Sequence, residues 1–212
     1  MLPVSAYTAP RGFTVWLTGL SGAGKSTLAA TLREHLIQGG LPNLTIFDGD
    51  EARALLWRDL GFTREDREAN IRRLGDLCTL LTGQGLVTIV AAISPYRRCR
   101  QDLRRRLQAF VEVYVACPLE VCERRDVKGL YARARAGEIK LFTGLDDPYE
   151  PPEAPEVTVC TDRETVEEGV AKIIAALLDR GLLRIAPAAD MDQGSGSALP
   201  TQVAGRLAGP CA

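Results

Sequence analysis

One stretch of the chain, Gly19-Leu20-Ser21-Gly22-Ala23-Gly24-Lys25-Ser26-Thr27, fits the pattern G-x-x-x-x-G-K-[ST]. It follows an apolar run and opens a helical pattern, which is the context in which this motif binds phosphate. The glycines let the backbone curl so that successive N–H groups point at phosphate oxygens, and the following helix adds its dipole. We predict that Lys25 reaches the β- and γ-phosphates of ATP and that the Ser26 hydroxyl ligates Mg²⁺.

Apolar runs rich in β-branched residues recur on both sides of this loop, and longer helical patterns separate them. We expect strands at 13–17, 44–47, 86–93, 111–116 and 156–160, and helices near 25–38, 64–81, 95–109, 119–124 and 163–183. Continuous apolar strands that alternate with helices indicate a parallel sheet covered on both faces. The prediction is an α/β fold, a three-layer doubly wound parallel sheet of the P-loop type, with ligands beyond the carboxyl ends of the strands.

The composition sets the limits of the domain. A chain of 212 residues with 46% hydrophobic and 25% charged residues suits one well-buried globular domain with a tail. We expect an N-terminal extension at 1–12, the P-loop domain at 13–186 and a disordered tail at 187–212, where Ala, Gly, Ser and Pro replace the periodic pattern.

Bulk properties also exclude several classes of function. No apolar run is long enough to span a membrane, and residues 1–12 lack the layout of a secretory signal, so we expect a cytoplasmic protein without membrane contact. The balance of 26 basic and 27 acidic residues argues against nucleic acid as a partner. The six cysteines and the single histidine lack metal-cage spacing. Six arginines crowd into 97–106, where helical spacing predicts that most are solvated.

An acidic pair ends the second predicted strand, at the edge of the sheet where the phosphate loop also emerges. Asp48 and Asp50 flank Gly49 there. Carboxylates in this position can hold Mg²⁺ or accept a proton from an attacking hydroxyl. The alternative is that Asp50 only caps a helix beginning at Glu51. We favour a functional role for Asp50, as proton acceptor and metal ligand, and leave both interpretations open for Asp48.

The segment that follows carries cations, an amide and an aromatic ring. Thr63 and Asp66 resemble a capping box, so a helix should begin near Arg64 and place Arg67 and Asn70 on one face. Together with Arg53 and Phe62, these side chains suit a nucleotide-like anion as a second substrate. The alternatives are a hydrophobic staple for Phe62 and a solvated helix face for Arg67 and Asn70.

Two further features border the same crevice. Ser94 precedes Pro95 at the end of the third predicted strand, where it reads either as a helix N-cap or as a substrate contact. A cationic, glycine-flanked segment runs from Lys128 to Phe142 and can serve as a lid over the transferred phosphoryl group. The alternative for this segment is a solvated loop.

These motifs together resemble the adenylylsulfate kinase family. The strings that carry the likeness are GLSGAGKST, DGD, DLGF, EDR, ISPYR, PLEVCE, KGLY, ARAGEIK, FTG and DDPYE, which run in family order over about residues 13–161. The chain departs from the family pattern at Glu51, Ala92 and Val127, and none of these departures replaces a matched charged residue. The resemblance implies phosphoryl transfer from ATP to the ribose 3′-hydroxyl of adenosine 5′-phosphosulfate, with Mg²⁺.

The resemblance also implies roles for individual residues. ATP phosphates would lie at Gly19–Thr27, with Lys25, Asp50 and Ser94 as catalytic residues and Ser26 and Asp50 at the metal. The second nucleotide would contact Arg53, Phe62, Arg67, Asn70, Ile93, Ser94, Lys128 and Phe142, and its adenine would stack between the two phenylalanines. The family marks the serine of ISPYR as a phosphoserine intermediate, whereas direct transfer needs mainly positioning and charge neutralisation, so we favour a substrate contact for Ser94.

The resemblance further implies a homodimer and raises a functional coupling to an ATP sulfurylase. Two other hypotheses stay open at this point. One is a kinase of a different alcohol, such as shikimate or a sugar acid, which would not need two phenylalanine platforms. The other is a catalytically silent nucleotide-binding module, which would not need Lys25, Ser26, Asp50 and Arg67 together.

Overall fold

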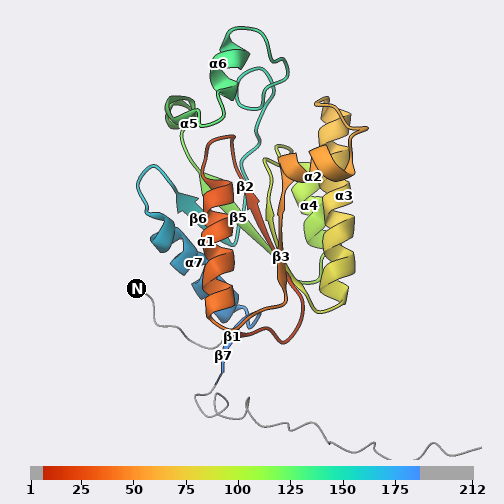
Figure 1. Cartoon of the computed structure of the whole chain (residues 1–212), viewed down its shortest axis with the longest axis vertical. Coiled ribbons are helices and arrows are strands. Elements are labelled where there is room, and N and C mark those ends of the chain that lie inside the picture. The colour runs from red at the N-terminus through yellow and green to blue at the C-terminus, as the bar shows by residue number, and fades with distance from the viewer. Residues whose placement is uncertain (1–6, 187–212) are drawn as a thin grey trace, which may run out of the picture.

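A computed structural model describes residues 7–186 of the chain, so the predicted tail at 187–212 lies outside the described residues (Figure 1). The centre is a parallel sheet with the strand order β3-β4-β2-β5-β6. Each predicted strand is confirmed to within a few residues. The bounds are β2 Thr14–Thr18, β3 Leu44–Asp48, β4 Val87–Ala91, β5 Phe110–Ala116 and β6 Val157–Cys160.

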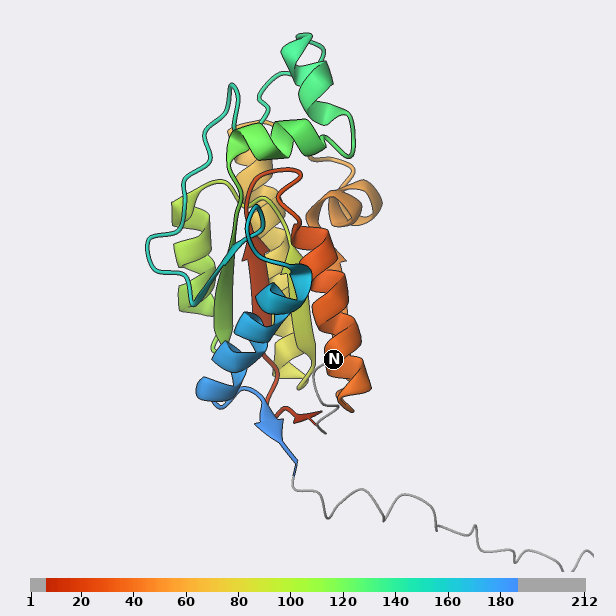
Figure 2. The ribbon, with the colours of Figure 1, turned by 90° about the vertical axis from the view of Figure 1, so that its left-hand side faces the viewer.

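Helices cover both faces of this sheet. Figures 1 and 2 show α1 (Lys25–Gln38) and α7 (Val166–Asp179) on one face and α3 (Arg64–Gly83) and α4 (Arg97–Arg106) on the other. Three shorter helices lie at the upper end of the molecule in Figure 1. They are α2 (Gly49–Leu56), α5 (Leu119–Arg125) and α6 (Leu130–Arg135). The predicted three-layer, doubly wound architecture is therefore confirmed.

The central strand shows why the middle of its sequence is apolar. Every residue of β2 is fully buried. Val15 and Leu17 join the core beneath α1 and α7, whereas Trp16 joins the core beneath α3 and α4. Because successive side chains of a strand point to opposite faces, a sheet buried on both faces favours apolar residues at successive positions. The buried hydroxyls of Thr14 and Thr18, at the two ends of β2, form hydrogen bonds instead.

The strand order places the binding crevice. The chain passes from β2 to β3 and β4 on one side and then to β5 and β6 on the other, so the order reverses at β2. The loops after β2, β3 and β4 all emerge at the carboxyl edge of the sheet, and ligands of such sheets bind beside this switch point. The described helices include none that is long and apolar enough to cross a membrane.

The structure also contains elements that the sequence did not predict. Tyr7–Thr8 (β1) pairs with Arg184–Ile185 (β7) as a small antiparallel sheet at the end of the molecule opposite the carboxyl edge (Figure 1). The short helix α6 was not expected, and a helix near α2 was considered only in the alternative in which Asp50 caps a helix beginning at Glu51. The helix expected at 95–109 begins only at Arg97, and the helix expected at 163–183 is shorter at both ends, with a Thr165–Glu168 capping box at its start.

Candidate active site

The phosphate loop has the conformation that its glycines predict. It connects β2 to α1, and Gly22 (φ 73°) and Gly24 (φ 98°) adopt left-handed backbone angles that side chains disfavour. Gly24 is the N-cap of α1 and has no side chain with which to cap it. The first N–H groups of a 14-residue helix are thus presented, with the positive end of its dipole, to an incoming anion.

Lys25 lies almost completely buried at the base of this loop. Its side chain is only 8% exposed, and its ammonium donates a hydrogen bond to the Leu20 carbonyl (2.7 Å). Burial lowers the pKa of Lys25 to about 8, although the nearby Asp50 and Asp48 carboxylates oppose this shift. Within residues 7–186 the ammonium has no direct carboxylate contact, so phosphate oxygens are the partners that would stabilise its charge.

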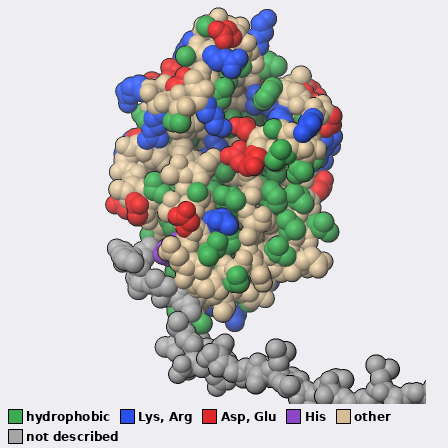
Figure 3. Space-filling view, in the orientation of Figure 1, with side chains coloured by type: hydrophobic (Ala, Val, Ile, Leu, Met, Phe, Trp, Pro, Cys, Tyr) green, Lys and Arg blue, Asp and Glu red, His purple; other side chains and the backbone are tan. Residues whose placement is uncertain are grey.

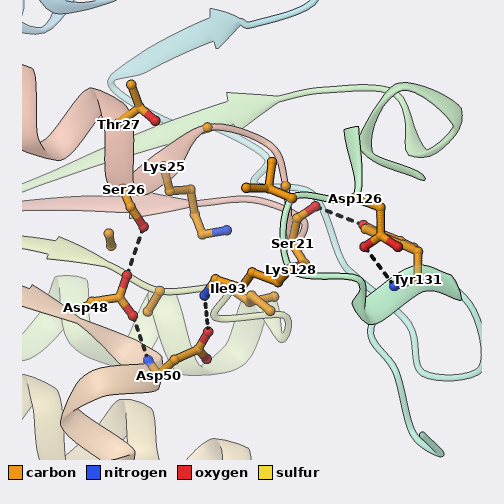
Figure 4. A pocket seen from close by; sticks show the side chains of 15 residues that line it. Ser21, Lys25, Ser26, Thr27, Asp48, Asp50, Ile93, Asp126, Lys128 and Tyr131 are labelled. Carbon is orange, nitrogen blue, oxygen red and sulfur yellow. Dashed lines mark hydrogen bonds and ion pairs between the residues drawn. The ribbon is translucent and has the colours of Figure 1, made fainter. Parts of the chain in front are cut away.

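Asp48 and Asp50 make different contacts from those predicted. Asp48, not Asp50, is the N-cap of α2, and its carboxylate accepts hydrogen bonds from the backbone N–H groups of Asp50 and Glu51. The same carboxylate accepts a hydrogen bond from the Ser26 hydroxyl (2.8 Å). Asp50 instead pairs with Lys128 (2.9 Å), and Figure 4 shows this continuous chain of contacts. The interpretation of Asp50 as only a helix cap is therefore wrong.

The oxygen atoms beside the loop fit a divalent cation. A hydroxyl on a phosphate loop and a carboxylate at the end of the neighbouring strand are the hard ligands that Mg²⁺ prefers alongside substrate phosphates. Ser26 and Asp48 provide this pair in direct contact. The predicted metal ligands were Ser26 and Asp50, and the structure brings Ser26 to Asp48 instead.

Two cavities adjoin at the carboxyl edge of the sheet. The smaller one, of about 180 Å³, lies over the phosphate loop. The larger one, of about 740 Å³, is of the size that holds nucleotide-like ligands. Asp50 and Lys128 line both cavities and so stand where the two ligands would meet. The residues that the two cavities share are Ser21, Asp50, Ala92, Ile93 and Lys128.

The larger cavity gathers all eight residues predicted to contact the second substrate. They are Arg53, Phe62, Arg67, Asn70, Ile93, Ser94, Lys128 and Phe142. The cavity is also lined by three further cations, Arg58 and, from the predicted lid segment, Arg133 and Lys140. Figure 3 shows that Lys and Arg side chains gather on the upper part of the molecule, where Figure 1 places α5 and α6. The chemistry of this cavity therefore favours an anionic ligand.

The helix α3 begins where it was predicted to begin, and it places Arg67 and Asn70 on the same buried face. Thr63 is its N-cap and accepts a hydrogen bond from the Asp66 N–H. Arg67 and Asn70 are 9% and 4% exposed, so the alternative of a solvated face is wrong. Arg67 donates hydrogen bonds to the carbonyls of Phe62 and Leu141. The Asn70 Oδ1 atom is buried without a hydrogen-bond partner among the described residues, as expected of an acceptor that awaits a ligand.

The two phenylalanines differ in their environment. Phe142 is 8% exposed and packs edge-on against Tyr131, with ring centroids 4.9 Å apart. Phe62 is 58% exposed, and the Arg53 guanidinium lies over its ring at 4.9 Å. A hydrophobic staple would bury Phe62 against its own helix, so that alternative is wrong. Both rings line the larger cavity, and adenine stacking between them stays a prediction.

Ser94 does not cap a helix. The N-cap of α4 is Tyr96, and Ser94 lies two residues earlier with a left-handed φ of 46°. The serine is fully buried, and its hydroxyl accepts a hydrogen bond from the Trp16 indole N–H (2.8 Å). The N-cap interpretation is wrong because contacts from distant parts of the chain, rather than the Ser-Pro pattern, fix this backbone.

The predicted lid touches both the loop and the acidic pair. Lys128 reaches Asp50, and the Tyr131 hydroxyl donates to the Ser21 carbonyl (2.9 Å). The Asp126 carboxylate accepts hydrogen bonds from the Tyr131 and Ala132 N–H groups and so stabilises the start of α6 (Figure 4). The sequence analysis included Tyr131 in the KGLY string and in the predicted lid but gave neither Tyr131 nor Asp126 a role, because their partners in the phosphate loop and in α6 are set by the fold.

Comparisons with known proteins agree with this geometry. The family model described as adenylylsulphate kinase matches residues 11–160. An adenylyl-sulfate kinase of Microcystis aeruginosa is 56% identical over 178 residues, which cover 84% of this chain and 98% of that protein. The APS kinase CysC of Mycobacterium tuberculosis, solved in complex with AMPPNP and APS, is 44% identical with a TM-score of 0.75 and covers 80% of this chain and 99% of that one.

A third relative shows that the fold also occurs within larger chains. The hexameric APS kinase of Thiobacillus denitrificans is 36% identical with a TM-score of 0.63, over 82% of this chain and 30% of that one. The family model covers most of the domain, and the relative from Microcystis is similar over nearly its whole length. The chain belongs to the adenylylsulphate kinase family.

Proposed function

We propose that the protein transfers the γ-phosphoryl group of ATP to the 3′-hydroxyl of adenosine 5′-phosphosulfate, which yields ADP and 3′-phosphoadenosine 5′-phosphosulfate. The observation that carries this proposal is the pair of adjoining cavities, one built on a phosphate loop and one rich in cations and aromatic rings. Such a pair fits a reaction between two nucleotides. Family membership assigns the same reaction class.

The ATP half of the site neutralises and positions the triphosphate. The loop N–H groups and Lys25 would hold the β- and γ-phosphates, and Mg²⁺ bound beside Ser26 would neutralise charge that develops on the transferred group. Asp48 is in contact with Ser26 and is the better placed carboxylate for this metal, directly or through water. Asp50 is then free for a different role.

The second half of the site would bind the phosphosulfate nucleotide. Arg53 and Arg67 would contact its anionic group, Asn70 would offer its unpartnered Oδ1 to a ligand donor, and the adenine would stack on Phe62 and Phe142. Lys128 would approach from the lid and close the site. Lys140 and Arg133 add positive charge at the rim of the cavity.

In the transfer step, the 3′-oxygen attacks the γ-phosphorus while the bond to the β,γ-bridging oxygen breaks. Asp50 accepts the proton of the 3′-hydroxyl, because its carboxylate stands between the two cavities. Lys128 orients that carboxylate through the 2.9 Å ion pair. Ser94 shapes the wall of the substrate cavity rather than attacking phosphorus, since its hydroxyl is buried and bonded to Trp16.

A panel of acceptors tests this function. ADP release would be followed with Mg-ATP and adenosine 5′-phosphosulfate, adenosine 5′-monophosphate, shikimate or gluconate. We expect kcat/KM for adenosine 5′-phosphosulfate to exceed that for each other acceptor by about a hundredfold or more. An acceptor without the phosphosulfate group would leave cations of the larger cavity without an anionic partner, which weakens its binding. Faster turnover of another alcohol would contradict the proposal, and nucleotide binding with no turnover would support the silent module.

The assembly and location of the protein follow as further proposals. We propose a homodimer that acts in the cytoplasm, where a sulfurylase that makes adenosine 5′-phosphosulfate would supply its substrate. The absence of a membrane-spanning helix among the described residues is compatible with this location. Light scattering of the purified protein would test the dimer.

A further inference from the structure

A buried arginine lies behind the substrate cavity and has no part in the mechanism above. Arg100 belongs to α4, in the arginine-rich segment that was predicted to be mostly solvated, and its side chain is only 2% exposed. Its Nε atom donates to the Glu112 carboxylate on β5 (2.8 Å). A buried charge needs such a partner. This ion pair accounts for one of the three nitrogens of the guanidinium.

The two other nitrogens bind carbonyls that belong to the site. Nη1 donates to the Ser94 carbonyl and Nη2 donates to the Glu150 carbonyl. Ser94 follows β4 and lines the substrate cavity, whereas Glu150 lies at the end of the segment through which the lid rejoins the domain. One planar, rigid group therefore joins the wall of the cavity to the root of the lid.

The Ser94 turn depends on contacts of this kind. Its φ of 46° is unfavourable for a residue with a side chain, so the surrounding structure has to hold it. Trp16 donates to its hydroxyl, Arg100 donates to its carbonyl, and the Thr18 hydroxyl donates to the Ile93 carbonyl just before it (2.7 Å). Each donor comes from a buried position behind the cavity.

The lid root is docked against the same turn. The Glu150 N–H donates to the Pro95 carbonyl (2.8 Å), and the Glu150 carboxylate accepts from the Arg97 N–H (2.7 Å). A few residues earlier, the Asp147 carboxylate accepts from the Tyr96 hydroxyl and lies 3.8 Å from the Arg67 guanidinium. The lid therefore rejoins the domain at residues that pack on the Ser94 turn. Arg100 is buried beneath both segments and donates hydrogen bonds to each of them.

We propose that Arg100 is a positioning residue for binding of the second nucleotide: it holds the Ser94 turn and the lid root in one geometry without touching the substrate. This inference rests on the proposed function. It predicts that loss of Arg100 weakens binding of the second nucleotide but not binding of ATP. Displacement of the turn would alter the larger cavity, whereas the phosphate loop, which Arg100 does not contact, would keep its affinity for ATP.

The neighbouring Arg104 provides a matched control. It lies one helical turn further along α4, and its side-chain hydrogen bonds go to Glu112 and Glu156. It therefore shares the Glu112 partner of Arg100 but contacts neither Ser94 nor Glu150 by these bonds. Because the Arg104 side chain is 36% exposed and that of Arg100 is 2% exposed, the stability of each variant is measured beside its kinetics, and the comparison is made between folded variants.

The kinetic test compares Arg100→Met, Arg100→Lys and Arg104→Met with the wild-type chain. We expect Arg100→Met to raise KM for adenosine 5′-phosphosulfate by about tenfold or more and KM for ATP by less than about twofold. Arg100→Lys should not restore the affinity, because an ammonium cannot reproduce a three-point fork, and Arg104→Met should change neither KM. Equal effects on both substrates, or full rescue by lysine, would contradict the inference.

A spectroscopic reading separates this inference from the proposed function. The chain has two tryptophans, so Trp57→Phe leaves Trp16, which contacts Ser94, as the only tryptophan, and its emission is excited selectively over that of the tyrosines. Adding Arg100→Met should shift the Trp16 emission, whereas adding Arg104→Met should not; unchanged emission in both would contradict the inference whether or not the protein turns over. Wild-type protein without turnover would contradict the proposed function instead. If Arg100→Met does not fold, Arg100→Met with Glu112→Gln takes its place, because it removes the carboxylate that would keep only Arg104 as a partner.

Discussion

Lys25 gives the ATP site a pH dependence that can be measured. Burial lowers the pKa of this lysine to about 8, so the free protein loses the cation as the pH rises through that value. Phosphate binding needs the protonated form. We expect kcat/KM for ATP to fall above about pH 8, approaching tenfold per pH unit, in profiles between about pH 6.5 and 9.5. The Kd of adenosine 5′-phosphosulfate is the control, and an unchanged kcat/KM for ATP would contradict the assignment.

Asp50 and Ser94 are expected to respond very differently to substitution. Asp50→Ala should lower kcat by about 10²–10⁴-fold, because it removes the proton acceptor.

Ser94→Ala should retain measurable activity. It should cost about 1–3 kcal/mol of stability, because the Trp16 N–H loses its buried acceptor. Rapid-quench kinetics with mass spectrometry tests the mechanism. A phosphorylated Ser94 that passes its phosphoryl group to the substrate at the turnover rate would contradict direct transfer.

These residues also show how far local sequence carries a prediction. The motif predicted the loop between β2 and α1, because a phosphate loop is a contiguous structure. It could not assign Ser26 to Asp48, since the two are joined only when β2 and β3 lie in the same sheet. The Ser-Pro pattern suggested an N-cap at Ser94, but Trp16 donates to the hydroxyl of this serine and Arg100 to its carbonyl from other elements.

The packing of α3 against α4 depends on Gly75. A Cβ atom at this position would lie 2.2 Å from a Leu103 methyl group, and Leu103 is itself buried. We expect Gly75→Ala to destabilise the fold by about 1–3 kcal/mol, because the overpacked helices must separate. Urea unfolding followed by circular dichroism measures this change.

Gly83, at the end of the same helix, is the matched control. A Cβ atom there meets nothing within 4 Å. Gly83→Ala should leave stability unchanged or raise it by up to about 1 kcal/mol, because alanine reduces the freedom of the unfolded chain. Equal destabilisation by both substitutions would contradict the packing argument.

The long helices and the strands of the central sheet were predictable, as was the short helix α5, whereas α2 and α6 were not predicted as elements. The first residue of α1 is fixed by the phosphate loop and that of α3 by the Thr63 cap, which are local signals. By contrast, α2 and α6 have only 8 and 6 residues, too few for a hydrophobic period to be seen. Their starts depend on Asp48 and Asp126, whose capping roles become clear only in three dimensions.

The two ends of the described chain meet far from the active site. Tyr7 in β1 is 7% exposed, belongs to the main core and forms a hydrogen bond with His35 (3.3 Å). This pairing of segments nearly the whole chain apart has no local signal, so the sequence analysis treated residues 1–12 only as an extension. The core of the P-loop domain therefore includes part of that extension.

Substitution of Tyr7 should separate stability from catalysis. We expect Tyr7→Ala to cost about 2–4 kcal/mol, because it leaves a cavity under β7, while KM and kcat stay unchanged below the unfolding temperature. Thr8→Ala, at an exposed position of the same strand, should cost much less. Calorimetry and steady-state kinetics on the same samples measure both quantities, and a matching fall in kcat would contradict the separation of this end from the site.

At the scale of the whole domain, two adjoining cavities meet at Asp50 and Lys128, and we propose that each holds one nucleotide. The most direct test follows the phosphoryl group itself: ATP labelled at the γ-phosphate is incubated with Mg²⁺, adenosine 5′-phosphosulfate and the full chain, and the products are separated by chromatography. The label should appear on the 3′-oxygen of 3′-phosphoadenosine 5′-phosphosulfate, and Lys25→Ala should abolish it. Label released only as inorganic phosphate, or found on any other acceptor, would contradict the account.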